Sequence, residues 1–135
     1  MFRFHKTLDV LTLFHAPASA PSRRILDILE TASVAGSSAN DSKKKLAFEL
    51  EVVEAPLVPT PDQLRSILDF VGENKVGIIL KGSGGKRDAM KALEMAGPGI
   101  SERVLRPLLV DWNNGRAVLG ADEKAVQSLV DTLPK

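Results

Sequence analysis

At 135 residues the chain has the length of one ordinary domain, and its 44% hydrophobic residues are enough to build a core. Its 18 basic and 17 acidic side chains give a formal net charge of +1, which supplies no field for nucleic acid or anionic lipid. The sequence contains no cysteine, so disulfides, thiolate nucleophiles, iron–sulfur clusters and zinc–thiolate sites are excluded within it.

Membrane and metal binding also find little support in the sequence. No apolar run approaches the roughly 18–20 residues needed to cross a bilayer. The two histidines, His5 and His15, cannot form a metal site by themselves. The first residues lack the apolar stretch of a secretory signal. We therefore expect no membrane span, no metal and no cofactor, with residues 1–8 leading into the first strand.

The first half of the chain predicts a β-α-β unit. Asp9–His15 is apolar and β-branched, which is typical of a buried strand. An amphipathic helix is predicted over residues 22–35. Residues 36–47 are rich in Ser, Asn and Lys and predict a mobile loop. Residues 48–53 alternate between apolar and charged side chains, which indicates a half-buried second strand.

The middle of the chain is predicted to be helical. Thr60 and Gln63 have the spacing of a capping box, with a proline at the first helical position between them. An apolar periodicity follows, and Gly72 ends that helix. Residues 76–80 form a short apolar run whose type periodicity does not decide. Residues 86–96 predict a weaker helix.

The chain from residue 108 onward predicts a β-hairpin and a helix. Residues 108–112 form a strand, Asn113-Asn114-Gly115 a turn and Arg116–Leu119 the return strand. A helix follows Asp122. The order β-α-β, helical insertion, β-hairpin-α outlines a single thioredoxin-like α/β domain over residues 1–135. We expect a four-stranded sheet with helices on both faces. The residues expected to be buried are Ile25, Leu29, Leu64, Leu68, Val110, Val126 and Leu129.

The glycine-rich segment from Lys81 to Lys86 invites comparison with a phosphate-binding loop. That motif needs a glycine five residues before Gly85, where Leu80 stands, and a Ser or Thr after the lysine, where Arg87 stands. Both tests fail, and we interpret the segment as a flexible connector.

A candidate site lies between the first strand and the first helix. Ser19 and the N–H groups that follow it lie at the start of the helix, where unpaired donors and the helix dipole attract anions. Arg23 in the first turn can add a fork of donors. The segment therefore predicts a small-anion site that includes Ser19, Ser22 and Arg23.

The spacing of His15, Ser19 and Arg23 resembles that of glutaredoxin-linked arsenate reductases with a thioredoxin fold, which carry His-x3-Cys-x3-Arg at this position. A serine stands here where that family has its cysteine. The resemblance implies that Ser19 occupies the place of the catalytic thiol, with His15 and Arg23 beside it.

A second part of this resemblance is Arg106-Pro107, just before the hairpin. In the reductases the proline is cis and faces the active loop, and the arginine helps to hold the oxyanion. The resemblance therefore implies a cis Pro107 and adds Arg106 to the anion-binding candidates. A third arginine of that family is unmatched, because Arg116 falls too early and Leu119 stands near its place.

A closer likeness covers nearly the whole chain. The segments FRFHKTLDVLTLFHAP, PTPDQLRSIL and RPLLVDWNNGRAVLG resemble a family of small fungal proteins of undefined function, described as mitochondrial redox proteins. This resemblance implies a thioredoxin-like fold, a mitochondrial location and an oxidoreductase role on small toxic molecules. The active-site cysteine proposed for that family has no counterpart here.

Three interpretations of the site remain open. A serine hydroxyl can neither form the mixed disulfide of the reductase reaction nor be reduced back, which favours a non-catalytic module that docks on a mitochondrial protein partner. The alternative is a protein that binds a small anion, or an oxidoreductase-like enzyme, using Ser19, Ser22, Arg23 and Arg106. In the third interpretation the serines cap the helix, the arginines are solvated and Pro107 shapes a turn.

Overall fold

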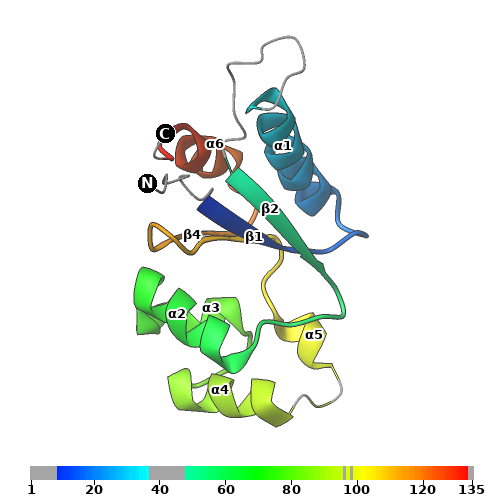
Figure 1. Ribbon diagram of the computed structural model, residues 1–135. Helices are drawn as coiled ribbons and strands as arrows, with labels where there is room; N and C mark the ends of the chain where they lie inside the picture. The colour runs from blue at the N-terminus through cyan, green and yellow to red at the C-terminus, as the bar shows by residue number, and fades with distance from the viewer. Residues whose placement is uncertain (1–8, 37–47, 96, 98, 134–135) are drawn as a thin grey trace, which may run out of the picture.

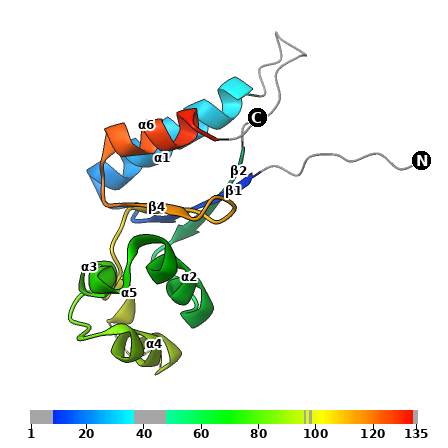
Figure 2. The same cartoon turned by 90° about the vertical axis from the view of Figure 1, so that its left-hand side faces the viewer.

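A four-stranded mixed sheet forms the middle layer (Figures 1 and 2). The computed structural model describes residues 9–36, 48–95, 97 and 99–133. The strand order is β2-β1-β3-β4, with β1 parallel to β2 and antiparallel to β3, and β3 antiparallel to β4. The strands are β1 (Asp9–His15), β2 (Phe48–Glu54), β3 (Leu108–Asp111) and β4 (Arg116–Leu119). The predicted hairpin therefore joins the sheet through β1.

Two helices cover one face of the sheet, α1 (Ala20–Gly36) and α6 (Glu123–Asp131) (Figure 2). They bury a cluster that includes Leu11 and Leu13 of β1. The side chains of Leu11 and Leu13 lie two residues apart, which puts them on the same face of the strand.

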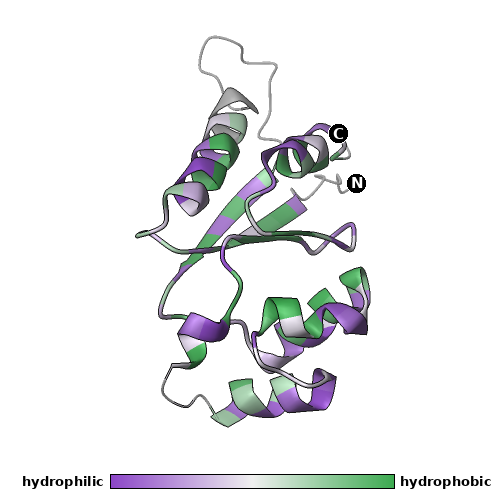
Figure 3. Cartoon of the chain, turned by 180° about the vertical axis from the view of Figure 1, so that it is seen from behind, coloured by the Kyte–Doolittle hydropathy of each residue, from purple (hydrophilic) through white to green (hydrophobic). Residues whose placement is uncertain are grey.

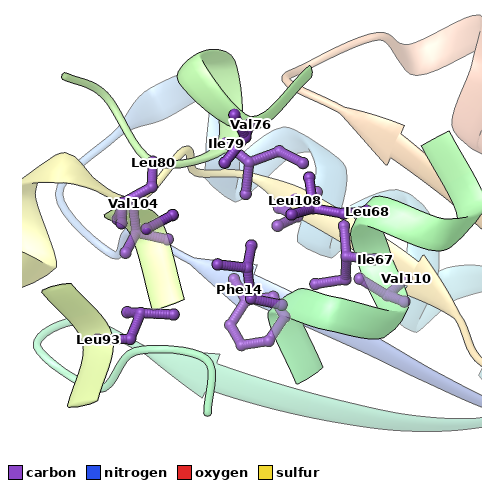
Figure 4. Close-up of a cluster of buried hydrophobic side chains, with 12 residues drawn as sticks. Phe14, Ile67, Leu68, Val76, Ile79, Leu80, Leu93, Val104, Leu108 and Val110 are labelled. Atoms are coloured by element: carbon purple, nitrogen blue, oxygen red, sulfur yellow. The ribbon is translucent and has the colours of Figure 1, made fainter. Parts of the chain in front are cut away.

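The opposite face is covered by the helical insertion, where a second cluster surrounds Phe14 of β1 (Figure 4). The insertion consists of α2 (Pro61–Val71), the 3₁₀ turn η1 (Glu73–Lys75), α3 (Val76–Ile79), α4 (Lys86–Met95) and α5 (Ile100–Arg103). All seven residues expected to be buried are buried. The thioredoxin-like fold class is therefore confirmed, with one apolar cluster on each side of the sheet.

Three predicted elements differ from the structure in extent. The first helix begins at Ala20 rather than residue 22, because Pro21 is accommodated in a first helical turn. It ends at Gly36, and residues 37–47 of the predicted loop lie outside the described residues. Hydrophilic and hydrophobic residues alternate along β2, as predicted, and this strand continues to Glu54 (Figure 3). The third strand stops at Asp111, one residue before the predicted end.

The helical insertion contains features that periodicity did not predict. Residues 76–80 are mostly the short helix α3, and Leu80 forms an isolated bridge with Val104. The four-residue helix α5 is too short to show a helical repeat in sequence. The predicted capping box is confirmed, since Gln63 N–H donates to Thr60 Oγ1 and Thr60 N–H to Gln63 Oε1, both at 3.0 Å.

Candidate functional site

The connection between β1 and α1 is organised by a buried serine. Ser22 and His15 are 0% and 2% exposed, and Ser22 Oγ lies 2.7 Å from His15 Nδ1. The N–H of Ala16 also donates to Ser22 Oγ, at 3.0 Å. No hydrogen bond joins His15 to Ser19 in the described structure. Ser22, rather than Ser19, is therefore the partner of the histidine, and it holds the loop against the end of β1.

The first N–H groups of α1 are largely occupied. Ser19 N–H donates to Ala16 O at 2.9 Å, and Ser22 N–H donates to Ser19 Oγ at 3.4 Å. Pro21 has no N–H to offer. Of the three remaining N–H groups at this helix start, only that of Ala20 has no partner among the described residues. The helix start thus keeps its dipole but few free donors.

One guanidinium nitrogen of Arg23 bonds the backbone of the loop. Its Nη1 donates to Pro17 O at 2.9 Å, and the residue is exposed. The structure places Ser19, Ser22 and Arg23 together, as their spacing predicts. One hydrogen bond joins Ser22 to Ser19, and the other bonds of their side chains go to His15 and to the loop backbone.

Arg106 lies at the carboxyl ends of β1 and β2, where its guanidinium donates hydrogen bonds to three backbone carbonyls and one serine hydroxyl. Nη1 donates to Val53 O at 3.3 Å and to His15 O at 3.5 Å. Nη2 donates to Leu57 O and, at 3.3 Å, to Ser101 Oγ. Nε is buried and has no partner in the part of the chain that the structure describes. Burial lowers the pKa of Arg106 from its ordinary value, because desolvation disfavours the charged form.

The peptide bond between Arg106 and Pro107 is cis, which is the geometry that the resemblance implies. A second cis bond, Ala55–Pro56, follows β2 and was not predicted. The carbonyl acceptors of Arg106 were also missed, because a backbone oxygen looks the same at every position of a sequence. Only folding shows that Val53 and Leu57 lie beside an arginine some fifty residues later in the chain.

The glycine-rich segment carries its own carboxylate where a phosphate-binding loop would need free donors. Gly84 N–H donates to Asp88 Oδ2 at 3.1 Å, and Arg103 Nε donates to Lys81 O at 2.7 Å. These contacts favour the connector interpretation. Among the described residues there is no group of three or more metal-ligating side chains, and no described helix is long and apolar enough to cross a membrane.

Arg116 belongs to a separate polar network at the far end of β3. Asp111 is fully buried and accepts from Arg116 Nη2 at 2.9 Å and from Asn114 Nδ2 at 3.0 Å. Arg116 Nη1 also donates to Thr132 Oγ1 at 2.6 Å. This arginine therefore joins the hairpin to the end of α6 and does not replace the unmatched third arginine of the reductases.

A mixed sheet with helices on both faces and a strand–loop–helix segment beside a cis-proline defines a thioredoxin-like α/β protein. Within that class, the chain belongs to the family described as "Protein of unknown function (DUF1687)", whose model matches residues 2–122. Among solved structures it is similar to an arsenate reductase from Vibrio cholerae, with a TM-score of 0.53 and 18% sequence identity. That likeness covers 90% of this chain and 98% of the reductase. No curated protein matches the sequence.

Proposed function

We propose that this chain is a non-catalytic thioredoxin-like module that docks on a mitochondrial protein partner. The observation that carries the proposal is that Ser22 N–H, Arg23 Nη1 and both terminal nitrogens of Arg106 donate to atoms of the chain itself. The sequence also supplies no thiol with which the reductase chemistry could proceed. The mitochondrial location rests on the resemblance to the fungal family.

The internal bonds make oxyanion capture unfavourable. An anion bound by Arg23 Nη1 would displace the carbonyl of Pro17, and one bound by the terminal nitrogens of Arg106 would displace those of Val53 and Leu57. Hydrogen bonds from charged groups contribute about 1.5–3 kcal/mol each, so each exchange loses much of what it gains. The hydrogen bonds of Arg23 and Arg106 hold the loops at this end of the sheet in place, as expected of a module that keeps the fold without the catalysis.

The alternative is a protein that binds a small anion at this place. The N–H of Ala20 and the half-exposed hydroxyl of Ser19 favour it, because both lie at the positive end of a 17-residue helix. The two functions differ in whether oxyanions stabilise the folded chain.

Thermal unfolding with arsenate, phosphate, sulfate and glutathione tests the choice. We expect no ligand to raise the melting temperature of the wild-type chain by more than it raises that of Arg23→Ala. A rise with one oxyanion that is lost on Arg23→Ala would overturn the proposal in favour of the anion-binding protein. Arg24→Ala, which removes an equally exposed cation that pairs with Glu123 of α6 instead of the loop, is the matched control.

The docking part needs a partner identified from mitochondria and reassembled from purified components. We expect the reconstituted complex to form equally well with the wild type and with Ser19→Ala. Failure to reconstitute any captured protein would contradict docking, whatever the outcome with oxyanions.

A further inference from the structure

The strand β2 forms one edge of the sheet along its full seven residues. Ala55 N–H donates inward to His15 O, which fixes the orientation of the backbone along the strand. Because that orientation alternates, the N–H and C=O groups of Leu50 and Val52 point away from β1. No described strand pairs with this outer side (Figure 1). The edge therefore offers a row of backbone donors and acceptors.

Two carboxylates flank this row on one face. Glu49 and Glu51 are exposed and two residues apart, so their side chains lie on the same side of β2. Neither forms an ion pair with any residue that the structure describes. On the opposite side of the strand, Leu50 packs partly buried against the cluster under α1.

The carboxylate of Glu51 is held in position by two partly buried hydrogen bonds in series. Thr12, which is fully buried on β1, donates from Oγ1 to Glu51 Oε1 at 2.8 Å. Trp112 Nε1 donates to the same Thr12 oxygen at 2.7 Å. The carboxylate of Glu51 is thus a preorganised acceptor. Through Thr12 it is connected to Trp112, the one tryptophan of the sequence, so a change in the bonding of Glu51 should reach the indole.

The other edge of the sheet lacks these properties. The strand β4 has four residues, and its cation, Arg116, is already paired with the buried Asp111. Within the described ranges, an exposed charge without an ion-pair partner is found along β2 and not along β4.

We infer that the outer edge of β2 binds an extended segment of a protein partner with Lys or Arg at alternate positions. The segment adds a fifth strand to the sheet, pairing with the backbone of Leu50 and Val52. Its basic side chains lie beside Glu49 and Glu51, and its intervening apolar residues cover Leu50. This inference rests on the proposed docking function and names the chemistry of the partner.

A second copy of the chain does not fit the same edge. Antiparallel pairing of all seven residues of β2 with a copy places Glu51 opposite Glu51 and Phe48 opposite Glu54. Like charges directly opposite one another destabilise a strand pair. The glutamates therefore disfavour self-association along β2 and favour a basic strand.

Binding of a synthetic probe tests the inference directly. The probe is a fluorescent octapeptide in which Lys and Val alternate, with a Glu and Val peptide as its counterpart. We expect the Lys peptide to bind the wild type and to lose about tenfold or more in affinity on combined Glu49→Lys and Glu51→Lys. The Glu peptide should bind that variant better than it binds the wild type.

A matched control separates the edge from net charge. Combined Asp27→Lys and Glu30→Lys makes the same change in charge on the exposed face of α1 and should leave binding of the Lys peptide unchanged. Equal loss in both double variants would overturn the inference, because it would show attraction to the whole molecule.

Strand addition has its own signatures. Binding of the Lys peptide should slow amide exchange at Leu50 and Val52 and change the fluorescence emission of Trp112. N-methylation of the peptide amides that pair with β2 should abolish binding. Unchanged affinity of the N-methylated peptide would overturn strand addition, and so would dimerisation of the free chain through β2. Neither result depends on the oxyanion measurements at Ser19, so failure of this inference and of the non-catalytic assignment can be told apart.

Discussion

Ser22 lies in the first turn of α1 with a buried hydroxyl that bonds both His15 Nδ1 and Ala16 N–H. Removing that hydroxyl leaves the buried Nδ1 of His15 and the partly buried N–H of Ala16 without a partner, which costs more than losing an exposed bond. We expect Ser22→Ala to lower the free energy of unfolding by about 1–3 kcal/mol.

Urea denaturation followed by Trp112 fluorescence measures this loss. The exposed Ser128→Ala on α6 is the control and should change stability by no more than about 0.5 kcal/mol. Equal effects of the two substitutions would show that the bonds of Ser22 contribute little.

Ser19→Cys places a thiol at the start of α1. The helix dipole there should lower the thiol pKa below the value of about 8.5 of a free cysteine. The shift should come from the helix, because Arg23 is bonded to Pro17 O. We expect faster alkylation by iodoacetamide below pH 7 than for Glu30→Cys in the same helix. Equal rates at the two positions would mean that the helix start no longer stabilises an anion.

At the scale of elements, Arg106 connects β1, the loop after β2 and α5 through one guanidinium. A lysine keeps the charge but has a single donor nitrogen and cannot reach these acceptors together. We expect Arg106→Lys to destabilise the fold by about 2 kcal/mol and to speed amide exchange around Leu57.

The matched control for this prediction is Arg65→Lys on the exposed face of α2. Its ion pair with Asp62 is solvated, and the change should stay within about 0.5 kcal/mol. If amide exchange around Leu57 is the same in both variants, Arg106 does not hold that loop.

Elements with a local signal were predictable, and elements defined by distant contacts were not. The strand Asp9–His15, the capping box at Thr60 and the hairpin turn each carry their cause in neighbouring residues. The short helix α3 buries Val76 and Ile79 in the cluster around Phe14, and α5 has only Ile100 partly buried against it. The spacing of Ser19, Ser22 and Arg23 indicated one loop and helix turn, but the sequence did not indicate their hydrogen-bond partners or those of Arg106, which bonds backbone oxygens that only the fold brings near.

At the scale of the molecule, the sheet separates two apolar clusters that stabilise it from opposite sides. Ile25 belongs to one cluster and Leu68 to the other, and both are fully buried. Alanine at either position should cost about 2–5 kcal/mol, and the two losses should add to within about 0.5 kcal/mol.

Unfolding of these variants should remain cooperative, because β1 contributes side chains to both clusters. Far-UV circular dichroism and Trp112 fluorescence should report the same urea midpoint. Leu57→Ala, at a residue 63% exposed, is the control and should have little effect. Separate midpoints in Ile25→Ala would show that the two sides of the sheet unfold independently.

The position of β1 inside the sheet has a consequence for biosynthesis. This strand is made first, yet it needs β3, which begins at Leu108, on one of its two sides. Since a chain leaves the ribosome from its N-terminus, the backbone groups of β1 that pair with β3 stay unpaired until the hairpin emerges. During that interval the apolar stretch from Leu11 to Phe14 is the part of the nascent chain that a chaperone would have to shield.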